Sequence, residues 1–340
     1  MKKSLVVALL LMLAPNFAFG RDMQALSASP APARPIVSAH QDARTQQSID
    51  VEKARQHFDK GEEFRKKEDW RLAVEEYGEA IKLNPKYVDA YNNRGYAYIE
   101  TREFDKAIAD LNIALELSPN SVNAYYNRAR AHYFKRSYSQ AILDFSEIIR
   151  LKPKSDEAFY YRGNAYLNSG DLDKAILDYS EAIKLNPTDA DAYNNRSVAY
   201  RRKGDYDQTI KDATEAIKNR PDDANAFYNR GIAHSEKGDY DKAMADYSKT
   251  IELNPDIAGV FDKLQSANIE RMIKENSNAI KLDPNNAGAY YNRGRAYYEK
   301  GDYERAAEDF DMAVKLNPLD AYARNFRDRT HTILRNRESK

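Results

Sequence analysis

Hydrophobic positions recur along the chain with a period of 34 residues. The stretch 158–187 reads AFYYRGNAYLNSGDLDKAILDYSEAIKLNP, and the next two stretches, ending at Pro221 and Pro255, repeat its pattern. Within each period the apolar residues fall at spacings of three and four on two segments, which predicts two amphipathic helices. Self-similarity of this kind indicates a solenoid, in which each unit packs only on its neighbours.

Turn and capping residues bound the two helices of each block. In the block that contains Gly170 and Asp171, the glycine suits a left-handed end of the first helix and the aspartate can cap the second. Proline then closes the block and a polar residue caps the next helix. The eight blocks start at Ala54, Val88, Val122, Asp156, Ala190, Ala224, Ala258 and Ala287 and close at Pro85, Pro119, Pro153, Pro187, Pro221, Pro255, Pro284 and Pro318.

Small residues inside the helices indicate where the two helices of a hairpin touch. A glycine such as Gly163 lies midway along most first helices, although glycine there costs about 1 kcal/mol relative to alanine. We expect a second backbone to approach closely at this point. The aromatic residue of the second helix, Tyr179 in this block, is expected to fill the gap between successive hairpins.

The period and the series Gly, Tyr, Ala, Phe or Tyr, Ala, Pro resemble tetratricopeptide repeats over about residues 54–318. The resemblance implies an all-α fold, a right-handed superhelical solenoid of antiparallel helix hairpins whose first helices line the inner face. It also implies a protein or extended-peptide partner, because such repeats usually bind and rarely catalyse.

One departure from the family pattern is an arginine just before the small residue of the first helix. An aspartate recurs sixteen residues after each arginine, so the two should meet across the hairpin as a bidentate, partly buried pair. The alternative is a row of arginines that binds an acidic ligand. The predicted pairs are Arg94–Asp110, Arg128–Asp144, Arg162–Asp178, Arg196–Asp212, Arg230–Asp246 and Arg293–Asp309.

A second departure is the seventh block, 258–286, which is 29 residues long and lacks the Gly-Asp turn. Apolar positions on both sides of the missing part keep the repeat pattern, which favours a shortened hairpin. No Gly or Pro lies between Val260 and Asp283, which favours one long helix instead. We favour the shortened hairpin.

The two ends of the chain differ from the repeats. Residues 1–20 have two lysines, an apolar run and small residues before Gly20, which predicts a cleaved signal peptide. An uncleaved membrane anchor would need about 20 apolar residues. Residues 21–49 are expected to be a disordered linker, the solenoid to occupy 50–320, and residues 321–340 to form a basic capping helix and tail. Contact of that helix with a membrane surface is the less favoured alternative.

The bulk composition excludes several classes of function. Lys plus Arg and Asp plus Glu are both 53, so no excess of basic charge indicates a nucleic-acid partner. Cysteine is absent, which excludes disulfides and thiolate chemistry. The five histidines show no metal-binding spacing, and His132 and His234 occupy a slot that is tyrosine elsewhere. We therefore predict no catalytic residue, no metal and no cofactor, and the chain is not expected to be an enzyme.

The candidate ligand-binding residues lie on the inner face of the first helices. Asparagine amides can donate and accept together, which suits a peptide backbone, and tyrosines add rigid apolar area. The alternative, which the sequence leaves open, is that these asparagines bond neighbouring helices. The candidates are Asn92, Asn93, Tyr96, Tyr126, Asn127, Arg130, Tyr160, Tyr161, Asn164, Asn194, Asn195, Tyr228, Asn229, Tyr291, Asn292 and Arg295.

Together these features predict an exported, periplasmic or secreted scaffold that binds a protein or peptide partner in the groove of the solenoid, without a membrane span in the mature chain. The alternative is an adaptor or regulatory subunit of a cell-envelope enzyme such as a protease or wall hydrolase. A hydrolase in its own right is disfavoured, because every carboxylate-rich position recurs with the repeat.

Overall fold

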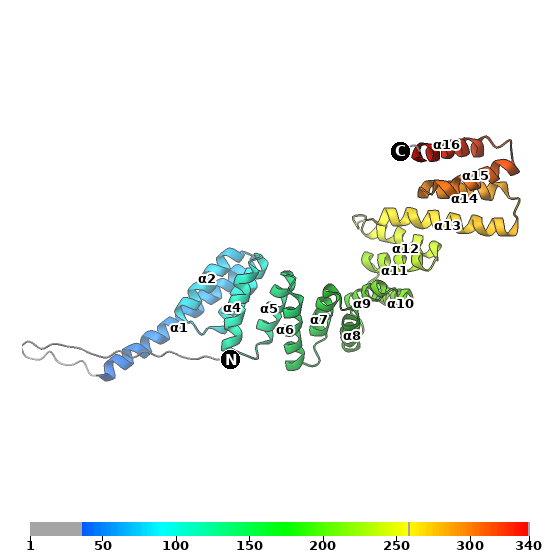
Figure 1. Ribbon diagram of the computed structural model, residues 1–340. Helices are drawn as coiled ribbons and strands as arrows, with labels where there is room; N and C mark the ends of the chain where they lie inside the picture. The colour runs from blue at the N-terminus through cyan, green and yellow to red at the C-terminus, as the bar shows by residue number, and fades with distance from the viewer. Residues whose placement is uncertain (1–35, 258, 339–340) are drawn as a thin grey trace, which may run out of the picture. The chain divides into compact units, whose positions relative to one another are not determined.

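The computed structural model describes residues 36–257 and 259–338, with side chains from 46 to 337. The predicted signal peptide lies outside the described residues. The described part of the chain contains sixteen helices and no strand (Figure 1). They are α1 (Ile36–Lys66), α2 (Trp70–Leu83), α3 (Val88–Glu100), α4 (Phe104–Leu117), α5 (Val122–Phe134), α6 (Tyr138–Leu151), α7 (Asp156–Ser169), α8 (Leu172–Leu185), α9 (Ala190–Lys203), α10 (Tyr206–Asn219), α11 (Ala224–Glu236), α12 (Tyr240–Leu253), α13 (Val260–Leu282), α14 (Ala287–Lys300), α15 (Tyr303–Leu316) and α16 (Ala321–Glu338).

The first helix is longer than the sequence predicts, because α1 begins at Ile36. The expectation of a disordered linker is therefore wrong for residues 36–49, while residues 21–35 lie outside the described part. No Gly or Pro occurs between Pro35 and Gly61, and the stretch contains four glutamines and three alanines, which form helix readily. The boundary between the two compact units of the chain, after Asp50, falls inside this helix.

The turns within the hairpins follow two patterns. In four turns the helix-ending residue is a glycine with positive φ: Gly170, Gly204, Gly238 and Gly301. In the first three hairpins a residue with a side chain takes the same left-handed position: Glu68 (φ 58°), Arg102 (φ 62°) and Arg136 (φ 61°). A left-handed backbone costs roughly 1–2 kcal/mol at a residue other than glycine, so these three turns are strained.

The glycines midway along the first helices accommodate a large side chain rather than a backbone, which is Leu111 beside Gly95 and an aromatic ring beside the others. A Cβ atom built on Gly163 would lie 2.8 Å from Cε1 of Tyr179, which is fully buried in the same hairpin. Gly231 meets Tyr247 in the same way, at 2.8 Å. Each ring thus packs on the small residue of its own hairpin, and the predicted contact with the following hairpin is confirmed for Phe145, which stacks on Tyr161 with ring centroids 5.8 Å apart.

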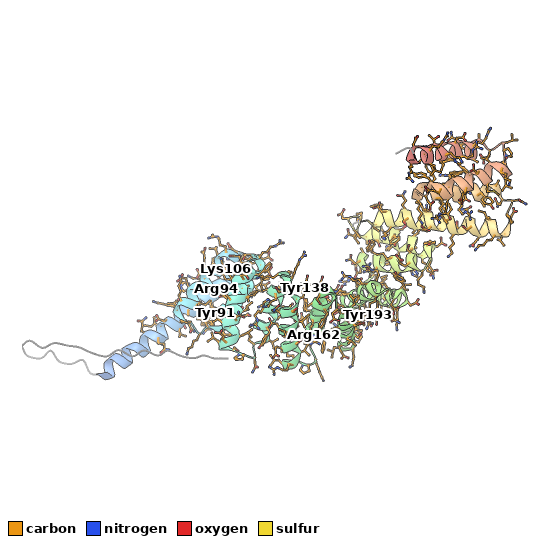
Figure 2. All side chains as sticks on the ribbon, in the orientation of Figure 1. Tyr91, Arg94, Lys106, Tyr138, Arg162 and Tyr193 are labelled. Carbon is orange, nitrogen blue, oxygen red and sulfur yellow. The ribbon has the colours of Figure 1, made fainter. Side chains whose placement is uncertain are left out.

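All six predicted Arg–Asp pairs are confirmed. Arg162 donates from Nε and Nη2 to the two carboxylate oxygens of Asp178, at 2.7 and 2.8 Å, and the aspartate is buried. Nη1 of the same arginine donates to Oγ of Ser146 in the preceding hairpin, at 3.0 Å. Each arginine thus fixes its own hairpin, and most also bond the preceding one; Figure 2 labels Arg94 and Arg162 on two of them.

The seventh block forms a single helix, α13, of 23 residues. The favoured prediction of a shortened hairpin is therefore wrong, and the physical reason is the absence of any residue that ends a helix between Val260 and Asp283. In Figure 1 this yellow helix is longer than its neighbours α12 and α14.

Two adjacent residues of α13 replace the contacts that a whole hairpin makes elsewhere. Arg271 pairs with Asp241 of α12, in the way that Lys237 pairs with Asp207 at the end of a first helix. Glu270 pairs with Lys300 of α14, in the way that the aspartate at the start of a second helix does. The helix therefore packs antiparallel to both α12 and α14.

The last helix, α16, covers the end of the stack. Ala323 and Thr330 are fully buried, and the ring of Phe326 stacks on Phe310 with centroids 5.5 Å apart. The predicted capping position of this helix is thus seen in the structure. Among the described helices, none combines the length and apolarity needed to span a bilayer.

Candidate functional site

The candidate residues occupy successive first helices of the hairpins. Two consecutive positions carry most of them: the first holds Asn or Tyr, and the second holds Asn except in α7, where it is Tyr161. Because the helices α3, α5, α7, α9 and α11 follow one another in the stack, the two positions form a row across five hairpins.

Asparagine amides in the second position bond to the first position of the preceding hairpin. Nδ2 of Asn127 donates to Oδ1 of Asn92 at 3.0 Å, and Nδ2 of Asn229 donates to Oδ1 of Asn194 at 2.9 Å. Both donating asparagines are buried. This asparagine ladder holds neighbouring first helices in register.

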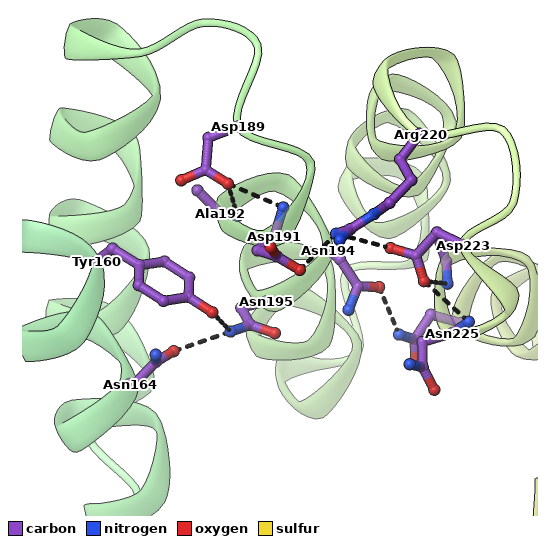
Figure 3. A network of polar contacts seen from close by, with 12 residues as sticks. Tyr160, Asn164, Asp189, Asp191, Ala192, Asn194, Asn195, Arg220, Asp223 and Asn225 are labelled. Atoms are coloured by element: carbon purple, nitrogen blue, oxygen red, sulfur yellow. Dashed lines mark hydrogen bonds and ion pairs between the residues drawn. The ribbon is translucent and has the colours of Figure 1, made fainter. Parts of the chain in front are cut away.

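The ladder continues through tyrosine between α7 and α9. Nδ2 of Asn195 donates to the hydroxyl of Tyr160 at 3.1 Å and to Oδ1 of Asn164 at 2.9 Å (Figure 3). The buried Tyr179 donates its hydroxyl to the same Asn164 oxygen at 2.7 Å. These contacts support the structural interpretation of the asparagines, in which their amides connect neighbouring first helices.

At the start of the row a carboxylate replaces the asparagine oxygen. Glu62 accepts from Asn93 at 2.7 Å, from Tyr77 at 2.5 Å and from Arg65 at 2.7 Å. Burial acts to raise the pKa of Glu62, but the hydrogen bonds from Arg65, Tyr77 and Asn93 hold it below its ordinary value. The carboxylate is therefore ionised at neutral pH and belongs to the scaffold.

Aromatic rings gather between α5 and α7. The ring of Tyr161 lies edge-on to Tyr126, with centroids 5.4 Å apart, and stacks on Phe145 at 5.8 Å. Burial raises the pKa of Tyr126, so its phenol stays neutral and can donate a hydrogen bond. A cavity of about 240 Å³ opens over these rings and is lined by Tyr126, Arg130, Tyr133, Phe134, Phe145, Tyr161 and Asn164.

Arg130 joins this aromatic cavity to the neighbouring hairpin. Its guanidinium lies 5.4 Å from the ring centroid of Tyr96 and 5.9 Å from that of Phe134, and it donates to Glu100 at 3.1 Å. Cation–π contacts at these distances hold the guanidinium in a fixed position. Arg130 can therefore present its remaining N–H groups to a ligand.

Three cavities share lining residues along α3, α5 and α7. Tyr126 lines both the aromatic cavity and a polar cavity of about 280 Å³ that includes Asn92, Asn93, Tyr96, Asn123 and Asn127. Arg130 and Phe134 line both the aromatic cavity and a third of about 460 Å³. The three cavities thus adjoin one another along α3, α5 and α7, and together they are called the track.

The candidates on α14 do not belong to this row. Tyr291 packs on Phe310 and Phe326 at the capped end, and Asn292 is exposed. Arg295 lies over Phe326. Helix α13, which has Asp262 and Lys263 at the two positions, interrupts the row of Asn and Tyr residues between α11 and α14. Contact of Tyr291, Asn292 and Arg295 with a ligand stays a prediction. Tyr228, on α11, remains in the row, and its ring centroid lies 6.2 Å from that of Tyr247.

Sequence reasoning missed four aromatic residues that line the cavities: Phe104, Tyr133, Phe134 and Phe145. The signal for Phe134 was present, because the same position is polar in the other full hairpins: Lys66, Glu100, Asn168, Arg202, Glu236 and Glu299. The side chain of Phe134 is 51% exposed, which an ordinary core residue is not.

Metal chemistry finds no support in the described part of the chain, where no group of three or more His, Cys, Asp or Glu side chains could hold an ion. His234 is buried and His132 half-buried, in the slot that tyrosine fills elsewhere. Burial lowers the pKa of both imidazoles.

Comparison with known families finds repeat models over most of the chain. Models described as TPR repeat match residues 61–101 and 163–204. Models described as tetratricopeptide repeat match 88–121, 122–155, 190–223, 224–257 and 287–319.

Solved structures of repeat proteins are similar in fold. A tetratricopeptide repeat protein from Parabacteroides merdae is 20% identical over 82% of this chain and 99% of its own, with a TM-score of 0.53. The C-terminal part of a TPR repeat-containing protein from Cytophaga hutchinsonii is 16% identical over 79% and 98%, with a TM-score of 0.52. YrrB, described as a TPR protein with an unusual peptide-binding site, is 25% identical over 56% and 98%, with a TM-score of 0.48.

Proposed function

The chain belongs to the tetratricopeptide repeat family, and on that premise we propose that it is a non-catalytic scaffold that binds an extended peptide segment of a partner protein over α3, α5 and α7. The observation that carries the proposal is the track of three cavities, in which the aromatic cavity shares Tyr126 with the polar cavity and shares Arg130 and Phe134 with the third.

The chemistry of the track suits a peptide better than a small metabolite. The asparagine ladder fixes its polar groups before a ligand arrives, which lowers the entropy cost of binding. The aromatic cavity can hold an apolar side chain, and Tyr126 and Asn164 lie at its wall to bond a peptide backbone. Openings shared by several hairpins fit a ligand that extends from one hairpin to the next.

Site-specific photo-cross-linking tests the proposal. A photo-reactive residue at Asn123, which is exposed and lines the polar cavity, should cross-link a partner in the bacterial envelope. The matched position is Lys211, exposed on the second helix α10, from which no cross-link to the same partner is expected. Tyr161→Ala should abolish the Asn123 cross-link. Equal cross-linking from both positions, or persistence in Tyr161→Ala, would refute binding over the first helices.

Export is part of the same proposal. Cleavage after Gly20 would give a mature protein that starts at Arg21, and N-terminal sequencing of the protein from envelope fractions would check it. If the cross-linked partner is a single envelope enzyme, the scaffold acts as its adaptor, whereas several unrelated partners would indicate a general binding role.

A further inference from the structure

Two aromatic rings, those of Phe104 and Phe134, lie near the turns of the second and third hairpins. This side of the two hairpins is called the turn edge, and the two rings are called the aromatic shelf. Phe134, at the end of α5, stacks on Phe104 of the preceding hairpin, with centroids 5.8 Å apart and planes inclined by 22°. Phe104 fills the slot that holds an aromatic residue in most hairpins, so its place is structural. Phe134 has no such role, because every other full hairpin places a polar residue there.

The cavity beside this shelf has a volume of about 460 Å³. It is lined by Ile99, Glu100, Arg102, Phe104, Arg130 and Phe134. Apolar side chains thus form one part of the wall and guanidinium groups another. Such a site accepts an apolar side chain that has an acidic neighbour.

The arginines of the two turns are uncompensated charges. Arg102 lines the cavity, and Arg136 lies two residues after Phe134; neither makes an ion pair with a side chain that the structure describes. The carboxylates around them are already occupied: Glu100 pairs with Arg130, Glu103 with Lys106, and Asp105 with Lys135.

Both arginines also occupy a position that disfavours a side chain. Their φ angles are 62° and 61°, whereas the equivalent residue is glycine in four later turns. A backbone outlier of this kind at the surface motivates the hypothesis that the residue has a function. The first hairpin has Glu68 in this position at φ 58°, so the second and third hairpins differ from it in the sign of the charge at the turn.

We propose that this turn edge docks an acidic segment of the partner peptide that carries an aromatic or large apolar side chain, with the ring against Phe134 and Phe104 and the carboxylates on Arg102 and Arg136. The proposal rests on the proposed function, since the cavity shares Arg130 and Phe134 with the rest of the track. It adds the chemistry of the ligand and the place where that chemistry is recognised.

Fluorescence anisotropy with designed peptides tests the inference on the full mature chain. The probe is a fluorescein-labelled dodecapeptide of Asp, Glu and Gly with one central Phe. Two matched probes replace the Phe by Gly, or all acidic residues by Lys. We expect binding of the first probe that weakens at least fivefold without the Phe, and no binding of the basic probe. Equal binding of the first two probes would overturn the proposal.

Glycine variants separate recognition from folding. The double variant Arg102→Gly, Arg136→Gly should melt at a higher temperature than the wild type, because it relieves strain, yet bind the acidic Phe probe at least tenfold more weakly. Glu68→Gly is the matched control, since it relieves the same strain at φ 58° without removing a cation. It should raise the melting temperature and leave binding unchanged.

The outcomes distinguish this inference from the proposed function. If the double glycine variant binds as the wild type does while Tyr161→Ala does not, the peptide is held by the aromatic cavity alone and the inference is wrong. If Glu68→Gly also loses binding, turn geometry rather than charge is responsible, and the inference again fails. Phe134→Asn, which installs the residue of α7, should lose the Phe-dependent part of binding only.

Discussion

The pair of Arg196 and Asp212 is the most buried of the six Arg–Asp pairs, with side-chain exposures of 16% and 1%. Arg196 donates from Nε and Nη2 to the carboxylate at 2.6 and 2.8 Å, and from Nη1 to Ser180 of the preceding hairpin at 2.9 Å. Asp212→Asn keeps the shape but removes the charge, and its amide would face a guanidinium donor. The guanidinium would then lie in the core without a counter-ion.

The expected loss of stability follows from this burial. Removing one partner of a buried pair costs about 3–5 kcal/mol. Arg196 retains its bond to Ser180 and its contact with the ring of Tyr193, at 5.7 Å, so the lower end, about 3 kcal/mol, is expected. Urea unfolding followed by circular dichroism measures the change. The control, Glu181→Gln, breaks the exposed pair with Lys184 and should leave the midpoint unchanged.

A loss of unfolding free energy below about 1 kcal/mol for Asp212→Asn would refute the claim that Arg196 and Asp212 form a buried charge pair. A second arm tests the same reasoning. Replacing both residues by leucine removes the uncompensated charge together with its partner, so the double variant should recover most of the stability. If the double variant is less stable than Asp212→Asn, the carboxylate contributes by packing rather than by charge.

Three further predictions concern single residues of the hairpins. The buried hydroxyl of Tyr247 makes no hydrogen bond of good geometry with the described residues and only a weaker contact with Ser235, so Tyr247→Phe should cost less than Tyr179→Phe, which loses a 2.7 Å bond and should cost about 1 kcal/mol in urea unfolding. Gly163→Ala should cost about 1–3 kcal/mol in the same assay, because the new methyl group would lie 2.8 Å from a buried ring. Burial lowers the pKa of His132 and His234 in the folded state, so the unfolded chain binds more protons and stability should fall as the pH drops below about 6.5. Replacing both by tyrosine, the usual residue of the slot, should flatten stability between about pH 5 and 6.5, and a profile that is unchanged by the replacement would count against burial as its cause.

Most of the fold could be predicted because its determinants repeat. An arginine and an aspartate such as Arg162 and Asp178 recur with a fixed separation in six hairpins, which places the two side chains opposite each other within each hairpin. A single sequence cannot decide whether an asparagine such as Asn127 bonds a neighbour or a ligand, because the same amide serves either purpose. The structure decides it through the position of Asn92 in the first helix of the preceding hairpin.

The wrong predictions share another cause, since they concern segments where the repeat pattern is interrupted or absent. Helix α13 has matching apolar positions on both sides of a deletion, and these are compatible with a hairpin or a helix. The residues after Pro35 lack an apolar face, yet helix α1 needs only residues of good helix propensity and no breaker. Phe134 was visible as an exception, but its exposure depends on contacts across hairpins.

The single helix at the seventh block also reverses the direction in which the later first helices run. A hairpin contributes two reversals of direction, so first helices that are separated by whole hairpins all run the same way. Helix α13 contributes one, and α14 therefore runs opposite to α11, although both have the sequence of a first helix. A peptide read from its N-terminus to its C-terminus over α3–α11 would meet the same side chains in the reverse sense on α14. The hairpin after α13 thus presents its first helix in the opposite direction, so one straight peptide could not contact both parts of the solenoid in the same way.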